Sequence, residues 1–168
     1  MPIPPGAKPP TKRSKSAQEK GLDWQGEFQQ FVEGYRNAFP IEIVRLYDTH
    51  SAGSFLPAQG GDFILIRNGH GVLLDTKYSG KNQSLVTCLK SAWSDSQASR
   101  MRLWSRAGGT SIVLFLGSGG MVEVWDASKL FEAYYTPRMK PNQNDCMLVV
   151  NKRDFFEEFK ENFIDFIW

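Results

Sequence analysis

Two short apolar runs on either side of a glycine-containing turn constrain the fold of this chain more than any other feature. The runs cover residues 63–66 and 72–74, and the turn between them reads Asn68-Gly69-His70-Gly71. Asn and Gly tolerate the positive φ angles that a tight hairpin turn needs. The sequence therefore predicts a β-hairpin here, and hence a sheet to which its two strands belong.

A second hairpin and one well-marked helix follow. Residues 111–116 and 121–125 flank Gly117-Ser118-Gly119-Gly120, which again indicates a hairpin. Between the two hairpins, Ser94-Asp95-Ser96-Gln97 fits a capping box, and the helix that it opens is expected to stop at Gly108-Gly109. In chain order, the sequence therefore predicts the first hairpin, then this helix, then the second hairpin.

Weaker patterns predict the other elements. Apolar residues at three- and four-residue steps from Leu22 indicate an amphipathic helix that ends before Pro40. The remaining expected elements are a strand over 41–47, a long loop over 48–61, a short helix capped by Ser128, a strand over 146–150 and a helix over 153–167. This order predicts an α/β fold with a mixed β-sheet flanked by helices.

Composition indicates one globular domain with a tail. The chain has 168 residues, 41% hydrophobic and 23% charged, and a chain of this size needs no disulfide or metal to hold a core. Cys88 and Cys146 are too few for a disulfide scaffold or a cysteine-ligated zinc site. Neither a membrane-spanning stretch nor a signal peptide is evident, so we expect a cytoplasmic protein without membrane contact.

The tail, residues 1–21, is expected to be a flexible, basic, proline-rich arm in front of a domain over 22–168. Five basic side chains and one acidic residue give residues 1–20 a net charge of +4, against −2 for the rest of the chain. The basic residues are Lys8, Lys12, Arg13, Lys15 and Lys20. Two interpretations stay open: a solubilising tail, or an arm that contacts phosphates.

Several enzyme classes lack the residues they need. A serine or cysteine nucleophile requires a nearby base, and the only histidines, His50 and His70, fall in a predicted loop and a hairpin turn. No GxxxxGK[ST] phosphate-binding loop occurs. These absences argue against nucleophilic hydrolases and P-loop enzymes.

Two carboxylates and a lysine lie where the ends of the first hairpin meet. Asp62 precedes one strand, and Asp75-Thr76-Lys77 closes the other. Since side chains alternate along a strand, Asp75 and Lys77 should point the same way, with the Thr76 carbonyl between them. Two carboxylates and a carbonyl form an oxygen-only ligand set suited to Mg²⁺, and a lysine beside the ion can stabilise charge on a scissile phosphate.

The triplet alone does not establish this chemistry. Glu158-Phe159-Lys160 has the same form but falls on a predicted helix, where residues two apart diverge. The alternative for Asp62, Asp75 and Lys77 is a surface cluster of ion pairs at a hairpin end.

At these residues the sequence resembles the PD-(D/E)XK nuclease superfamily, and within it the RecU-like and phage-type Holliday junction resolvases. The resemblance covers roughly residues 22–126 and rests on the order and spacing of short motifs. These are Gly60-Gly61-Asp62-Phe63-Ile64, Leu73-Leu74-Asp75-Thr76-Lys77-Tyr78-Ser79, Ser84-Leu85, Ser96-Gln97, Arg100-Met101 and Gly108-Gly109.

The resemblance implies a restriction-endonuclease-like core and a role for each site residue. Asp62 and Asp75 would hold Mg²⁺, with Mn²⁺ as a substitute, and Lys77 would be the catalytic lysine. Glu27, on the first helix, matches the acidic residue that often completes such a site, although a lone helical Glu is otherwise a solvated residue. Gln97 would lie near the site, with the capping box as its alternative role.

Two positions depart from the family pattern. Gly61 stands where the family has proline, a change expected to matter little. Asp75 replaces the commoner glutamate, and its shorter side chain alters the reach toward the metal.

The charge pattern suits a polynucleotide. Residues 77–106 carry six basic side chains and one acid, so we expect contacts to the DNA backbone from this segment and from the arm. On the helix the same residues could instead form a solvated face. The expected DNA-binding residues are Lys81, Lys90, Arg100, Arg102, Arg106, Lys12, Arg13 and Lys15.

The function expected from the resemblance is a Mg²⁺-dependent, structure-selective endodeoxyribonuclease of phage or bacterial origin that resolves four-way (Holliday) junctions. Paired cuts across a two-fold junction imply a homodimer. Surplus C-terminal aromatic residues could form its contact or pack in the core, and the loop over 48–61 could project between DNA arms. The alternatives are a nicking, restriction or repair nuclease on ordinary duplex, and a catalytically inactive DNA-binding protein of the same fold.

Overall fold

The computed structural model describes residues 15–35, 38, 40–46 and 59–163. They form one six-stranded sheet with the strands in sequence order, β1-β2-β3-β4-β5-β6. Every neighbouring pair is antiparallel except β3 and β4, which run parallel. The strands are β1 (Glu42–Arg45), β2 (Phe63–Arg67), β3 (His70–Tyr78), β4 (Thr110–Leu116), β5 (Met121–Asp126) and β6 (Cys146–Asn151).

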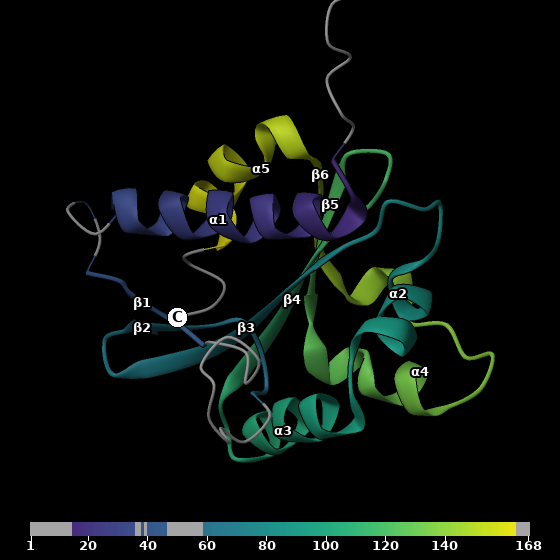
Figure 1. Cartoon of the computed structure of the whole chain (residues 1–168). Helices are drawn as coiled ribbons and strands as arrows, with labels where there is room; N and C mark the ends of the chain where they lie inside the picture. The colour runs from purple at the N-terminus through teal and green to yellow at the C-terminus, as the bar shows by residue number, and fades with distance from the viewer. Residues whose placement is uncertain (1–14, 36–37, 39, 47–58, 164–168) are drawn as a thin grey trace, which may run out of the picture.

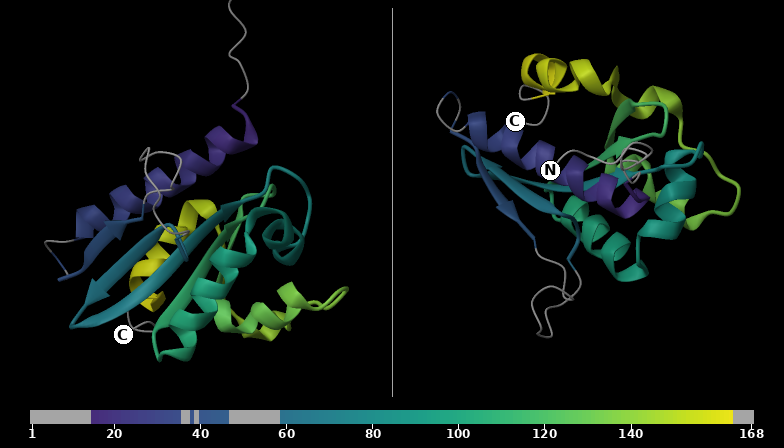
Figure 2. Two further views of the ribbon diagram at one scale, coloured as in Figure 1. Left: turned by 60° about the horizontal axis from the view of Figure 1, so that its bottom comes forward. Right: turned by 45° about the horizontal axis from the view of Figure 1, so that its top comes forward.

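Helices cover both faces of this sheet (Figures 1 and 2). One face packs against α1 (Ala17–Tyr35) and α5 (Lys152–Glu158), and the other against α2 (Leu85–Ala92), α3 (Asp95–Arg106) and α4 (Phe131–Tyr135). Each face has its own apolar core, because β3 and β4 are buried on both sides. The fold is therefore α/β with a mixed sheet, as the sequence predicts.

Both predicted hairpins are present. In the first, Arg67 pairs with His70, so the turn consists of Asn68 and Gly69 alone and is shorter than expected. Their φ angles of 51° and 81° are positive, as a two-residue turn of this kind requires. In the second, Gly120 supplies a positive φ of 78° between β4 and β5.

The first helix begins earlier than expected. α1 starts at Ala17 and not at Leu22, because Ser16 and Glu19 form a reciprocal capping box. The Glu19 carboxylate accepts the Ser16 N–H at 2.6 Å, and the Ser16 hydroxyl accepts the Glu19 N–H at 3.2 Å. The last five residues of the expected arm, 17–21, are therefore helical.

Three further elements differ from the sequence prediction. α2 was not expected, although Ser84 caps it by accepting the Thr87 N–H. Asp126, not Ser128, caps the turn η1 (Ala127–Lys129) in front of α4. The expected helix over 153–167 is α5 followed by a π-helical turn, η3 (Phe159–Phe163).

The C-terminal aromatic residues that the structure describes belong to the core. Phe155 and Phe159 are buried against α1, where Phe159 meets Phe28 at 5.6 Å between ring centroids. Phe156 is half-buried beside Phe31 at 4.7 Å. Core packing accounts for the burial of these three rings. Within the described parts of the chain, no helix combines the length and hydropathy that crossing a bilayer requires.

Candidate active site

Asp62 and Asp75 meet at the open end of the first hairpin. Phe63 pairs with Leu74, and the Asp62 N–H continues this ladder by donating to the Leu74 carbonyl at 2.8 Å. The Asp62 Oδ2 accepts two hydrogen bonds from Thr76, at 2.7 Å from the backbone N–H and at 2.6 Å from the hydroxyl. Asp62 is thereby fixed beside the residue that follows Asp75.

Asp75 is completely buried and accepts hydrogen bonds from three side chains. Its Oδ1 accepts from Lys77 Nζ at 2.8 Å and from Gln97 Nε2 at 2.9 Å, and its Oδ2 accepts from Trp93 Nε1 at 2.7 Å. The donors come from β3, α3 and the residue after α2. Three elements therefore fix the orientation of one carboxylate.

Burial and charge shift the pKa values of this pair. Burial raises the pKa of Asp75 to about 6, against the lowering effect of Lys77, and the nearby Asp62 carboxylate adds to the rise. Burial alone would lower the pKa of Lys77, but Asp75 and Asp62 together raise it above its usual value. Lys77, whose side chain is only 13% exposed, is therefore an ammonium ion at neutral pH.

The donor set at this hairpin end has the chemistry that Mg²⁺ prefers. In a β-strand, the N–H and C=O groups of one residue point to the same side of the strand. The Thr76 N–H points to Asp62, so the Thr76 carbonyl is also on the Asp62 side of β3. The Asp62 Oδ1 accepts no hydrogen bond from the residues that the structure describes. Asp62, Asp75 and Thr76 thus offer hard oxygen ligands that fit a cation retaining several waters.

Two observations limit this fit. The three donors to Asp75 use three of the roughly four lone-pair sites of its carboxylate, and one site on Oδ2 is left for an ion. Within the described residues, no group of three His, Cys, Asp or Glu side chains is placed to hold a metal. Waters and a substrate phosphate would have to supply the remaining ligands.

Gly61 matters more than the sequence suggests. A Cβ built at this position would lie 2.7 Å from the Leu74 carbonyl oxygen and 3.1 Å from its carbon, closer than backbone atoms tolerate. That carbonyl accepts the Asp62 N–H. The expectation that glycine here matters little is therefore wrong, because the close approach of strands that positions Asp62 needs a residue without a side chain.

Gln97 reaches the site although it also lies in the first turn of α3. The Ser94 hydroxyl accepts the Gln97 backbone N–H at 3.1 Å, which is one half of the predicted capping box. The other half does not form, because the Gln97 side chain turns to Asp75. The residue therefore contributes its backbone to the cap and its side chain to the site.

Glu27 makes its described contacts elsewhere. It lies on α1, and its carboxylate pairs with Lys152 of α5 at 2.7 Å. α1 and α5 cover one face of the sheet, whereas Trp93 and Gln97 reach Asp75 from the other. The structure thus does not join Glu27 to the Asp75 hydrogen-bond network.

The expected DNA-binding residues are dispersed. Lys15 pairs with Asp23 at 2.7 Å, and Lys90 donates to the Thr136 carbonyl at 3.2 Å. Lys81 is exposed after β3. Arg100 lies beside Gly60, while Arg102 and Arg106 line a cavity between α3 and α4. Lys12, Arg13, His50 and residues 48–58 of the expected loop lie outside the described residues.

Trp93 is the site residue that sequence reasoning missed. It follows α2, is 5% exposed, and packs against Phe131 and Tyr134 with ring centroids 6.1 and 5.3 Å away. The sequence marks Trp93 only by its position directly before the Ser94 cap. No local pattern connects it with Asp75, 18 positions earlier.

Comparisons with known proteins give a likeness of structure only. No protein-family model matches the chain, and no curated protein matches it in sequence. Among solved structures, one similar chain is the Holliday junction resolvase Hjc of the archaeal hyperthermophile Archaeoglobus fulgidus. The two are 11% identical with a TM-score of 0.42, and the similarity covers 77% of this chain and 88% of that one.

Proposed function

We propose that this protein is a Mg²⁺-dependent, structure-selective endodeoxyribonuclease that hydrolyses phosphodiester bonds in four-way junctions. One observation carries the proposal. Asp62 and Asp75 meet at a hairpin end, the Lys77 ammonium group contacts Asp75, and donors from three parts of the chain hold Asp75 in one orientation. A surface cluster of ion pairs would not require a completely buried carboxylate.

Each residue has a chemical part in this proposal. Asp62, Asp75 and the Thr76 carbonyl would hold the ion, which when bound supplies an activated water and neutralises phosphate charge. Lys77 carries its positive charge beside both carboxylates and can stabilise the charge that develops on the scissile phosphate. Trp93 and Gln97 hold Asp75 in place, so the site is organised before substrate arrives.

The choice of a branched substrate and of a homodimer rests on the sequence resemblance. A junction resolvase must cut two strands related by a two-fold axis, so two copies of the site are needed. We expect one subunit to contribute each site, and sedimentation analysis with and without a four-way junction measures the assembly.

The deciding experiment compares two substrates of one sequence. A labelled four-way junction and linear duplex are incubated with the full-length protein and Mg²⁺, Mn²⁺ or EDTA. We expect paired cuts in the junction with either metal, little cleavage of the duplex, and none in EDTA. Asp75→Asn keeps the size of the side chain and should abolish cleavage while leaving junction binding intact.

One observation favours a second candidate, a DNA-binding protein that does not cut. Asp75 already accepts three hydrogen bonds, and the described residues supply only two carboxylates to the hairpin end. Junction binding without cleavage in either metal would support this candidate. Equal cleavage of both substrates would instead indicate a nuclease that acts on ordinary duplex.

A further inference from the structure

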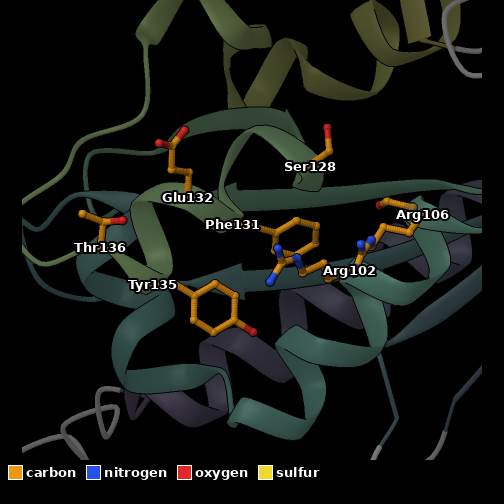
Figure 3. A pocket seen from close by; sticks show the side chains of 8 residues that line it. Arg102, Arg106, Ser128, Phe131, Glu132, Tyr135 and Thr136 are labelled. Atoms are coloured by element: carbon orange, nitrogen blue, oxygen red, sulfur yellow. The ribbon is translucent and has the colours of Figure 1, made fainter.

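The face of α3 next to α4 carries a cavity that the proposed catalytic chemistry does not use. Its volume is about 640 Å³. The lining residues come from α3, η1, α4 and the residue after it, and they are Arg102, Ser105, Arg106, Ser128, Phe131, Glu132, Tyr135 and Thr136. Figure 3 shows the guanidinium groups of Arg102 and Arg106 turned toward its middle, near the Phe131 ring.

The two arginines have their donors available. Arg102 and Arg106 lie four residues apart and thus on one side of α3. Neither donates a hydrogen bond or forms an ion pair with a residue that the structure describes, and Arg102 instead lies over the Tyr135 ring, 5.7 Å from its centroid. Two guanidinium groups with unused donors suit a phosphate, which accepts several hydrogen bonds.

The aromatic part of the cavity indicates more than a phosphate. Tyr135 is 44% exposed, and the buried Phe131 is a second ring of the lining. A nucleobase stacks on an aromatic face or on a guanidinium plane. A duplex keeps its bases stacked on one another, so only an unstacked nucleotide can use such a surface.

The cavity is joined to the candidate active site through α3. Gln97, which contacts Asp75, is on the same helix, five residues before Arg102 and nine before Arg106. At about 1.5 Å per helical residue these separations correspond to roughly 8 and 14 Å along the axis. Because 3.6 residues make one turn, Arg102 and Arg106 also lie roughly 140° and 180° around the helix from Gln97, so a strand that reaches both sites passes around α3.

We propose that this cavity binds a nucleotide of an unpaired DNA strand, with its phosphate on Arg102 and Arg106 and its base on Tyr135. This inference rests on the proposed nuclease function and deepens it, because continuous stacking is interrupted at a branch point, where a nucleotide leaves the stack at a lower cost than within a continuous duplex. Glu132 opposes an anion here, and its carboxylate points away from the two arginines (Figure 3).

The test measures DNA binding by the full-length protein in EDTA, so that no strand is cut. Fluorescence anisotropy with labelled oligothymidylate and with a matched duplex compares Tyr135→Ala, Arg106→Ala and Glu132→Gln. We expect Tyr135→Ala and Arg106→Ala to weaken single-strand binding about tenfold, the scale of one lost stacking or charged contact. Glu132→Gln should strengthen it, and Tyr135→Ala should leave duplex binding unchanged.

Matched controls separate this cavity from general charge effects. Arg153→Ala removes one positive charge from α5, on the opposite face of the sheet, and should change single-strand binding less than twofold. Thermal melts of all variants verify folding. An unchanged affinity in Tyr135→Ala, or an equal loss in Arg153→Ala, would overturn the proposal.

Two further measurements identify the ligand and separate the cavity proposal from the nuclease proposal. Thymidine monophosphate should compete only weakly, because the strand adds neighbouring contacts; equally tight binding of the mononucleotide would overturn the assignment to a strand. Asp75→Asn should keep the affinity for oligothymidylate. If the wild type fails to cut any DNA yet binds oligothymidylate through Tyr135, the nuclease proposal fails and the cavity assignment stands.

Discussion

At the scale of single residues, Trp93 determines how Asp75 is presented. Its indole N–H occupies one carboxylate oxygen, while Lys77 and Gln97 share the other. Trp93 acts on the site only through Asp75, so it is a positioning residue. The chain offers a matched comparison, because Trp125 belongs to the same core, is also buried, and donates its indole N–H to the Glu123 carboxylate at 2.8 Å and not to Asp75.

We expect Trp93→Phe to lower Mg²⁺-dependent junction cleavage by about 10- to 100-fold, the usual effect of removing a partner behind a metal ligand. Stability should fall by about 1–3 kcal/mol, because a buried acceptor loses its donor. Trp125→Phe should cost similar stability and leave cleavage unchanged. Single-turnover rates over a Mg²⁺ titration, with thermal melts, measure both quantities; equal cleavage losses in the two variants would contradict a positioning role.

The raised pKa of Asp75 predicts opposite pH trends for stability and for cleavage. With a folded pKa of about 6 against the usual 3.8, the native metal-free protein holds a proton that the unfolded chain releases between these values. Its free energy of unfolding should therefore decrease as the pH rises from 4 to 6. Cleavage should increase over the upper part of this range, because ion binding requires the ionised carboxylate.

Chemical denaturation in EDTA and cleavage rates in Mg²⁺, both measured across this pH range, test the two trends. Asp75→Asn is the reference for stability, since it cannot titrate at this position. The difference in unfolding free energy between wild type and variant should decline with rising pH. A difference that stays constant would show that Asp75 keeps an ordinary pKa.

At the scale of elements, the close contact of Gly61 with β3 positions Asp62. We expect Gly61→Ala to lower stability by roughly 1–3 kcal/mol, because the added methyl group overlaps the Leu74 carbonyl. Cleavage measured well below the melting temperature should also fall, since that carbonyl holds the Asp62 backbone. Gly119→Ala, in the turn between β4 and β5 with no atom within 4 Å of its Cβ, should change neither.

Turn residues and helix caps in the sequence correctly predict the elements that they start or join. The two hairpins follow from Asn68-Gly69 and from the glycines at 117–120, and α3 follows from its Ser94 cap. α2 was missed because it has only eight residues and its apolar residues serve a core formed by distant strands. The start of α1 was misplaced because its cap lies in a stretch whose charge and prolines suggest an arm.

In the candidate site, too, local patterns predict some contacts, and others depend on how distant segments pack. The meeting of Asp62 with Asp75, and the common face of Asp75 and Lys77, follow from hairpin geometry and the two-residue period of a strand. Trp93 could not be predicted, because its contact with Asp75 depends on how α2 packs on the sheet. The Glu27 pair with Lys152 joins residues 125 positions apart, which no local pattern reveals.

At the scale of the whole molecule, the sequence places a run of basic charge in front of α1. Residues 1–14 contain Lys8, Lys12 and Arg13 and no acidic residue, while the Ser16–Glu19 capping box keeps α1 intact without them. Deleting this segment therefore removes none of the elements that the structure describes. Its two open roles, solubilising tail and phosphate-contacting arm, predict different behaviour in salt.

We expect deletion of residues 1–14 to weaken junction binding most at low salt and to reduce the slope of log affinity against log salt by up to about 3, one for each lost phosphate contact. Cleavage at saturating protein should be unchanged, because Asp62, Asp75 and Lys77 remain. Binding isotherms at several KCl concentrations measure the slope, and a full-length variant with glutamine at the three basic positions is the matched control. If both proteins keep the wild-type slope, the segment makes no phosphate contact. The salt dependence must then come from the folded domain, and Arg102 and Arg106 are the first residues to substitute.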